Sequence, residues 1–408
     1  MGREQILRGR IVSRSMDIND GLLAMDGGHI TYAGPASGFR GELDGGEPSG
    51  FGVKTGPAGS ILLPGLVDLH CHGANGSDFS EGSVEGARSA ARYLHSHGTT
   101  TLLASLVTAA PADLLRNLKA LRSLQEEGLI AGSHLEGPFL SAGQCGAHDP
   151  ALLLAPDACL MADLFEAAGP SLASITLAAE LPGAPELLDL LTARGVLPSL
   201  GHTAAAHRVA AAFLDRAATG LAKAQEGRRP TVTHLFNAMP AMHHRSPGPV
   251  SACLSAARAG AAVVELIADG VHLAPETVKT VFELVGAENI ALVTDSMAAT
   301  GLHDGHYRLG TLGVTVRGGV ARVDSTGAIA GGTATLLDVV RATVTAGVSL
   351  SDAVTSASAV PAAVLGLSSK AGDIRTGMPA DVVVVDSDLV LTGVLRGGKW
   401  QAPPARHF

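Results

Sequence analysis

The chain has 408 residues, with 29 Lys and Arg against 38 Asp and Glu, which gives a formal net charge of -9. A hydrophobic content of 46% and a charged content of only 16% exclude a disordered chain and predict a large buried core. The acidic balance argues against nucleic acid as a partner, because duplex binding needs clustered Lys and Arg. The sequence contains no run of 18 uninterrupted apolar residues, so we expect no membrane span.

Histidine and glycine are unusually frequent, with 16 and 51 residues respectively. The four cysteines are too few and too scattered for a disulfide framework or a CxxC zinc site. The opening residues lack the apolar segment of a signal peptide. We therefore expect a reduced, cytoplasmic protein whose histidines are either incidental or metal ligands.

The first 60 residues are predicted to form short strands. Residues 6–12 and 21–33 are apolar and rich in strand formers, and Asp26-Gly27-Gly28 predicts a hairpin turn. Residues 41–59 contain seven Gly and two Pro, which predicts a loop.

From residue 61 onward, apolar runs of strand length alternate with segments of helix length. The eight runs cover 61–69, 99–108, 129–135, 172–180, 196–202, 231–236, 262–268 and 290–295. In the helical segment 111–128, one face carries Leu114, Leu118, Leu121 and Leu124. Glycines suited to a left-handed C-cap end several such segments, namely Gly98, Gly128 and Gly195. Strands that are apolar on both faces and alternate with helices predict an α/β fold, a (β/α)8 TIM-like barrel.

The end of the chain is predicted to return to strands. A last helical stretch over 333–367 is followed by apolar runs, of which 382–385 is the clearest buried strand. We therefore expect residues 1–60 and 370–408 to form one small β-sandwich domain, with the barrel over 61–369 inserted between them.

Metal-binding side chains gather at the predicted strand ends, where the chemistry of such barrels lies. These residues are His70, His72, His134, Glu136, His202, His234, Asp269, His272 and Asp295. Because side chains at i and i+2 share a face of a strand, His70 and His72 can both point into the barrel mouth. Imidazole and carboxylate groups suit zinc or another divalent ion, and burying so many polar groups without a metal would be costly. The pattern predicts a metal-dependent site.

The same segments carry a resemblance to a known family. They are GLVDLHCHG at 65–73, HLEGPFL at 134–140, LGHT at 200–203, THLFNAM at 233–239, IADGVH at 267–272 and LVTDS at 292–296. Along essentially the whole chain, they resemble the N-acetylglucosamine-6-phosphate deacetylases of the amidohydrolase superfamily. The resemblance implies hydrolysis of the acetamide of N-acetyl-D-glucosamine 6-phosphate to D-glucosamine 6-phosphate and acetate, in amino-sugar catabolism or cell-wall recycling.

The resemblance also implies roles for individual residues. Metal ligands are expected at Glu136, His202 and His234, and for a second ion at His70, His72, Glu136 and Asp295. One or two divalent ions per subunit are implied, with two favoured; zinc is the first candidate, and Fe, Co, Mn and Cd are alternatives. Asp295 is expected as the catalytic acid and base, and His148 as the group that polarises the substrate carbonyl. Substrate contacts are expected at Ala147, His148, Asn237, Ala238, Arg245, Asp269, His272, Ile329, Ala330 and Gly331.

Arg245 is the best candidate for binding the phosphate, because its planar guanidinium matches phosphate oxygens. The family pattern also implies a homodimer. His134 could be a ligand by geometry, but the family pattern gives it no such role. For Glu180, at the end of another strand, we expect a structural hydrogen bond.

Two alternative functions remain open. The enzyme could act on another N-acetyl sugar, such as N-acetylgalactosamine 6-phosphate or an unphosphorylated sugar. The chain could also be a non-catalytic relative that only binds a sugar phosphate, although such relatives usually lose metal ligands that this sequence keeps.

Overall fold

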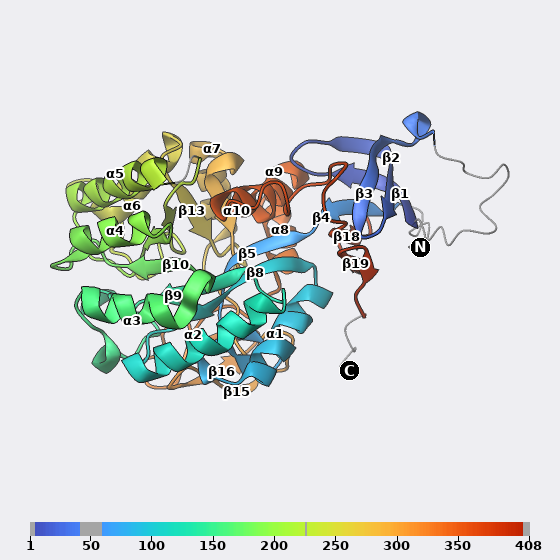
Figure 1. Cartoon of the computed structure of the whole chain (residues 1–408). Coiled ribbons are helices and arrows are strands. Elements are labelled where there is room, and N and C mark those ends of the chain that lie inside the picture. Colours follow the sequence, from blue (N-terminus) through green and yellow to red (C-terminus); the bar gives the residue numbers. More distant parts are fainter. Residues whose placement is uncertain (1–4, 41–58, 225–226, 403–408) are drawn as a thin grey trace.

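The computed structural model describes residues 5–40, 59–224 and 227–402 and has two parts, a large barrel and a smaller sheet beside it (Figure 1). The loop predicted over 41–59 lies outside the described residues except for Gly59. No helix in the described ranges is long and apolar enough to cross a membrane.

Eight parallel strands build the barrel, which confirms the predicted fold class. They are β5 (Leu66–Cys71), β8 (Thr99–Leu106), β9 (Gly132–Glu136), β10 (Leu172–Leu177), β11 (Leu197–Leu200), β12 (Thr231–Val232), β13 (Val263–Leu266) and β14 (Ile290–Leu292), each paired with the next. The first and last strands meet just beyond β14, where Asp295 N donates to His70 O at 2.9 Å and His72 N donates to Ser296 O at 2.7 Å. This seam brings three of the predicted metal ligands together, His70 and His72 from the first barrel strand and Asp295 from beyond the last.

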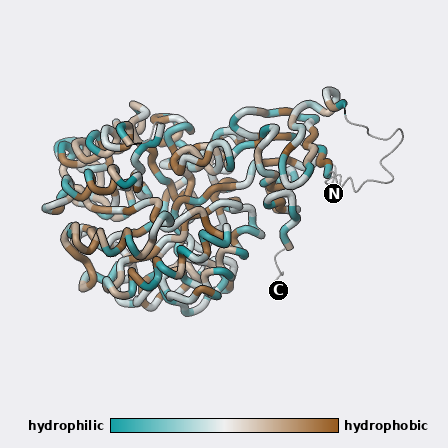
Figure 2. The backbone as a smooth tube through the Cα atoms, viewed as in Figure 1, coloured by the Kyte–Doolittle hydropathy of each residue, from teal (hydrophilic) through white to brown (hydrophobic). Residues whose placement is uncertain are grey.

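Helices pack around the barrel strands (Figure 1). They are α1 (Val84–Ser96), α2 (Pro111–Glu126), α3 (Ala158–Ala168), α4 (Ala184–Ala193), α5 (His207–Ala224), α6 (Gly248–Arg258), α7 (Pro275–Val285), α8 (Leu336–Thr345), α9 (Leu350–Ala357) and α10 (Ala359–Val364). The four predicted leucines of α2 are buried, and Figure 2 shows hydrophobic and hydrophilic segments alternating along the outer helices. The apolar face of each amphipathic helix therefore packs against the barrel, and its polar face is exposed to water.

The helical stretch predicted over 333–367 is confirmed as mainly helical. It is divided into three helices, because Gly347 takes a left-handed φ of 94° after α8 and Ser358 leaves the helical region between α9 and α10. The predicted C-capping positions Gly98, Gly128 and Gly195 do take positive φ values, as expected.

The two ends of the described chain pair in one mixed sheet of seven strands. Its order is β20 (Lys399–Trp400), β19 (Leu391–Arg396), β18 (Val382–Val385), β4 (Ile61–Pro64), β1 (Gln5–Val12), β2 (Asp17–Asp26) and β3 (His29–Pro35). The predicted hairpin turn is confirmed, with Gly27 and Gly28 at positive φ between β2 and β3. The domain division at residues 60 and 370 stays a prediction.

The run 61–69 was predicted as one barrel strand, and this is wrong. Its first part, β4, pairs with β1 and β18 of the terminal sheet, and only β5 enters the barrel. Pro64 and Gly65 separate the two strands, and a Cβ on Gly65 would lie 2.1 Å from the Thr100 hydroxyl. Proline and glycine at this position let the chain pass from one sheet into the other.

A three-stranded antiparallel sheet at the barrel mouth was not predicted. It consists of β15 (Gly305–Leu309), β16 (Leu312–Arg317) and β17 (Val320–Val323), with glycines at positive φ in its turns. A second small element, β6 (Gly73–Ala74) paired with β7 (Ser77–Asp78), follows β5. Both lie beside the site that the strand ends form.

Candidate metal-binding active site

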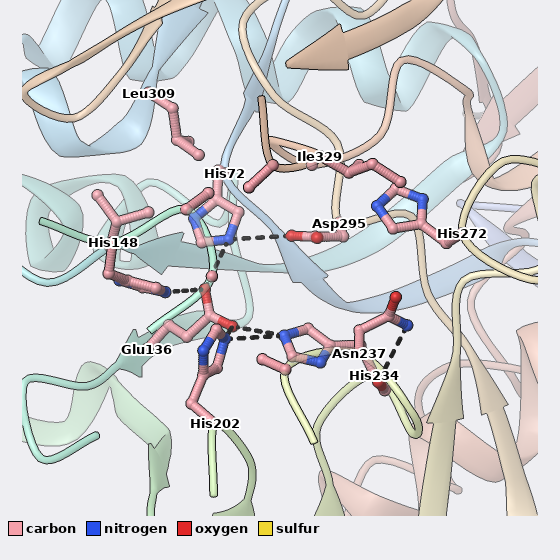
Figure 3. Close-up of a pocket in the computed structure, with 16 residues that line it drawn as sticks. His72, Glu136, His148, His202, His234, Asn237, His272, Asp295, Leu309 and Ile329 are labelled. Carbon is pink, nitrogen blue, oxygen red and sulfur yellow. Dashed lines mark hydrogen bonds and ion pairs between the residues drawn. The ribbon is translucent and has the colours of Figure 1, made fainter. Parts of the chain in front are cut away.

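A pocket lies over the carboxyl ends of the barrel strands (Figure 3). Its predicted lining residues are His72, Glu136, Ala147, His148, His202, His234, Asn237, Ala238, His272, Asp295, Ile329 and Gly331. Four further lining residues were not predicted, namely Val107, Gly146, Leu309 and Ala328. The structure therefore brings together most of the predicted site in one place.

The first group of potential ligands surrounds one oxygen of Glu136, the last residue of β9. Its Oε1 lies 3.0 Å from His202 Nε2 and 2.9 Å from His234 Nε2, and the two nitrogens are 3.1 Å apart. His202 Nδ1 lies 2.8 Å from the carbonyl oxygen of Gln144, so in the neutral ring the proton belongs on Nδ1. The Nε2 lone pair then faces other acceptors, an arrangement that a cation would satisfy.

The second group surrounds the other oxygen of Glu136. His72 Nε2 lies 3.2 Å from Glu136 Oε2 and 3.1 Å from Asp295 Oδ1, and His70 Nε2 lies 3.5 and 3.4 Å from the same two oxygens. His70 Nδ1 faces Glu265 Oε2 at 3.3 Å, so in the neutral ring the proton again belongs on Nδ1 and the Nε2 lone pair is aimed into the cluster.

The donor set fits a divalent metal ion. In a tetrahedral site with bonds of about 2.0–2.1 Å, the ligand atoms stand roughly 3.3 Å apart. The separations within both groups, from 2.9 to 3.5 Å, lie around that value. Glu136 belongs to both groups, so its carboxylate is placed to bridge them.

The charges of the cluster favour a cation as well. Burial raises the pKa of Asp295 and Glu136, but the surrounding histidines, His70 first, outweigh burial and hold both pKa values well below the ordinary range. Among the protein groups alone, burial would lower the pKa of His72, and its hydrogen bonds to Asp295 and Glu136 raise it to about 9. Ionised carboxylates are thus held in a buried pocket, where a bound cation would interact strongly with them.

Backbone strain marks the same residues. His202, His234 and Asp295 follow their strands with left-handed φ values of 47°, 29° and 49°. Such values are uncommon for residues other than glycine and concentrate at functional sites, because packing must hold them against their local preference. Here the turn directs each side chain into the pocket as the backbone leaves the barrel.

His148 is held as a hydrogen-bond donor. Its Nδ1 accepts from the backbone N–H of Thr108 at 3.2 Å, so the ring proton lies on Nε2, which is 3.2 Å from Glu136 Oε2. Burial lowers the pKa of His148 to about 4. The neutral imidazole therefore presents an N–H group to the pocket.

The other side of the pocket carries His272 and Asn237 (Figure 3). His272 Nδ1 is hydrogen-bonded to Asp269 Oδ2 at 2.8 Å; burial would lower the pKa of His272, but Asp269 raises it. Asn237 Nδ2 donates to His234 O at 3.2 Å. Asp269 therefore supports His272 from outside the pocket and does not line the pocket itself.

Besides Asp269, two further predicted contact residues do not line the pocket of their own chain. Arg245 is exposed, with its guanidinium 2.8 Å from His244 Nε2. Ala330 is fully buried beneath the lining residues Ile329 and Gly331.

Two buried carboxylates behind the ligands were missed. Glu265 Oε2 contacts His70 Nδ1 and accepts from the backbone N–H of His234, both at 3.3 Å. Asp68 accepts from the Thr294 hydroxyl at 2.7 Å, and burial raises its pKa to about 6. An acidic residue inside an otherwise apolar strand was a signal that could have found either one.

Two other rim residues make structural hydrogen bonds, as expected for Glu180. His134 uses both ring nitrogens, with Ser105 Oγ 2.9 Å from Nδ1 and Thr176 Oγ1 2.8 Å from Nε2. Glu180 accepts from the backbone N–H of Ala204 at 2.6 Å and from the Thr203 hydroxyl. The side chains of His134 and Glu180 therefore hydrogen-bond to neighbouring barrel residues and do not line the pocket.

Comparisons with known proteins agree with this geometry. The model of the Amidohydrolase family matches residues 61–401. An N-acetylglucosamine-6-phosphate deacetylase of Homo sapiens is 36% identical over 86% of this chain and 86% of its own length, and one of Bacillus subtilis is 34% identical over 84% and 85%. A structure of the Mycobacterium smegmatis deacetylase, a mutant in complex with N-acetyl-D-glucosamine-6-phosphate, is 37% identical with a TM-score of 0.87, covering 98% of this chain and 100% of that one.

Proposed function

Because this chain belongs to the amidohydrolase family, and within it to the N-acetylglucosamine-6-phosphate deacetylases, we propose that it hydrolyses the acetamide of N-acetyl-D-glucosamine 6-phosphate. The products are D-glucosamine 6-phosphate and acetate. The observation that carries this proposal is the convergence of buried carboxylates and imidazole nitrogens at one pocket, with Asp295 among them.

The proposal includes a divalent metal, with zinc first and Fe, Co, Mn or Cd as alternatives. Two ions per subunit are favoured, one held by Glu136, His202 and His234 and the other by His70, His72, Glu136 and Asp295. When bound, such an ion lowers the pKa of a water ligand towards about 7 and polarises a carbonyl oxygen.

The protein groups supply the proton transfers. The Asp295 carboxylate accepts a proton from the attacking water and returns it to the sugar nitrogen as the C–N bond breaks, so that it acts first as base and then as acid. The Nε2–H of His148 donates to the carbonyl oxygen, where negative charge develops in the transition state. The tautomer imposed by Thr108 supports this role.

The sugar is proposed to contact the other side of the pocket. Its contacts there include Ala238, Asn237 and His272, with Asp269 orienting His272 from behind. Ala147, which packs against the apolar cluster of Val107 and Leu309, is a further proposed contact. The segment 329–331 forms a further wall, in which Ala330 supports its lining neighbours.

Arg245 is exposed on its own chain, and the proposal therefore includes a homodimer in which the partner's Arg245 binds the phosphate. A cytoplasmic location also remains part of the proposal. The four described cysteines are free thiols, as a reducing compartment keeps them.

Acetate release and metal content test this function directly. The wild-type protein is expected to release acetate from N-acetylglucosamine 6-phosphate much faster than from the unphosphorylated sugar or from N-acetylgalactosamine 6-phosphate. Asp295→Asn is expected to lower kcat by a factor of about 10²–10⁴, the usual contribution of a general acid and base. Wild-type turnover by this variant would overturn the mechanism, and equal rates on both glucosamine substrates would remove the role of Arg245.

A further inference from the structure

The pocket has an apolar end that the metal ligands and Asp295 do not use. Val107 and Leu309 line it; each is only 4% exposed, and both belong to one buried apolar cluster with Met297 and Ala330. In Figure 3 Leu309 lies above His148 and beside His72, whereas His272 and Asn237 lie on the opposite side of the cluster. Leu309 therefore lies across the catalytic centre from His272 and Asn237.

The two apolar residues come from distant parts of the chain. Val107 follows β8 of the barrel, and Leu309 is the last residue of β15 in the small antiparallel sheet. The turn after Leu309 lies directly against Val107, because a Cβ built on Gly310 would come within 2.7 Å of Val107 Cγ2. Gly310 also has a left-handed φ of 54°. Only glycine fits this turn without moving Val107.

Hydrogen bonds to a buried carboxylate and a neighbouring hydroxyl hold the backbones of Val107 and Gly310 in place. Asp78, which is 1% exposed, accepts from Gly310 N at 3.1 Å and from Ser80 N at 2.7 Å. The Ser80 hydroxyl in turn accepts from Val107 N at 3.1 Å. One acidic side chain at the start of η2 (Phe79–Glu81) thus ties the barrel strand to the turn of the small sheet. The apolar wall is consequently fixed on both sides.

We propose that Val107 and Leu309 form the acyl site, which receives the acetyl methyl group and limits the acyl chain to two carbons. The inference rests on the proposed function. The amide carbon must lie between His148 and Asp295, and the hydroxylated sugar extends toward Asn237 and His272. The third substituent of that carbon, the methyl group, then points to the apolar end. A rigid wall there rejects a longer chain, because close-packed side chains cannot yield to an added methylene without strain.

The test compares kcat/KM for the N-acetyl and N-propanoyl derivatives of glucosamine 6-phosphate. The wild type is expected to prefer the acetyl compound by about 10- to 200-fold, the range for one methylene in an apolar pocket. Leu309→Ala and Val107→Ala are expected to reduce this preference about tenfold or more, through a gain on the propanoyl substrate. The control Leu302→Ala removes a leucine that precedes the same sheet, is 36% exposed and does not line the pocket, and it is expected to keep the wild-type ratio.

A second variant covers the case in which truncation damages the fold. Val107→Ile adds a methyl group to the wall and is expected to raise KM or lower kcat for the acetyl substrate. Inhibition by glucosamine 6-phosphate, which has no acyl group, is expected to stay at the wild-type level.

Several results would overturn the acyl site. An unchanged acetyl-to-propanoyl ratio in Leu309→Ala, or an equal loss on both substrates, would show that the wall is merely structural. A parallel loss of product inhibition in Val107→Ile would lead to the same conclusion. Any of these variant results, obtained with a wild type that releases acetate normally, would overturn the acyl site but not the proposed function. A wild type that is inactive on the acetyl substrate would overturn the proposed function itself.

Discussion

Replacing Glu265 by Gln tests whether a carboxylate behind the proposed ligands maintains the proposed metal site. Glu265 Oε2 lies 3.3 Å from His70 Nδ1 and from the backbone nitrogen of His234, so it contacts one residue of each ligand group. The carboxylate can only accept, so in the neutral, metal-binding form of the His70 ring it keeps the proton on Nδ1 and the lone pair on Nε2. Glutamine has nearly the same shape, but its NH2 group can face Nδ1 and favour the wrong tautomer.

The size of the effect follows from the geometry. Loss of a hydrogen-bond partner behind a ligating histidine typically weakens metal binding about 10- to 100-fold. Both contacts of Glu265 exceed the usual N–H···O distance of about 2.9–3.0 Å. We therefore expect the lower part of that range, a 10- to 30-fold loss of affinity, equivalent to roughly 1.4–2 kcal/mol.

The assay is a competition titration with a chromophoric zinc chelator, accompanied by elemental analysis after dialysis. Glu276→Gln, which removes an exposed carboxylate at the start of α7, is the matched control and is expected to bind zinc like the wild type. Zinc affinity within twofold of the wild type in Glu265→Gln would refute the reasoning, because the carboxylate would then not determine the ligand tautomer.

Three further predictions concern the metal, the subunit contact and the barrel seam. Chelation is expected to lower the unfolding temperature measured by calorimetry, because an ion bound only by the folded state stabilises it; an unchanged temperature would contradict the proposed site. Equal amounts of Asp295→Asn and Arg245→Ala subunits, once exchanged, are expected to recover about a quarter of wild-type acetate release, since one site in each mixed dimer is intact; recovery no greater than the sum of the parents would exclude a shared site. Thr294→Val leaves buried Asp68 without its 2.7 Å hydroxyl partner and is expected to cost about 1–3 kcal/mol in urea unfolding, whereas a loss below 0.5 kcal/mol would count against this seam.

Local patterns predicted much of the site because its residues obey local rules. The alternation of apolar runs and amphipathic helices indicated the barrel, and the rule that chemistry lies at strand ends was sufficient to select Glu136, His202 and Asp295. The two-residue period of a strand placed His70 and His72 on one face. Their convergence in the structure follows from the closed barrel, which brings all eight strand ends into one ring.

Other features depend on which segments meet in space. The division between β4 and β5 is decided by pairing partners from both ends of the chain, although Pro64 and Gly65 hinted at it. The acidic residues Asp68 and Glu265 stood out within apolar strands, yet only the packed barrel shows that they support the ligands or the seam beside them.

The sequence by itself determined the fold class, the residues at the barrel rim and the family, since periodicity and short motifs are properties of neighbouring residues. Only the tertiary structure decided the tautomers of His148 and His202, the exposure of Arg245 and the contact of Val107 with the turn after Leu309. The physical reason is that a hydrogen bond or a packed wall requires two groups at a defined distance. For residues far apart in the chain, that distance is set by the fold rather than by local pattern.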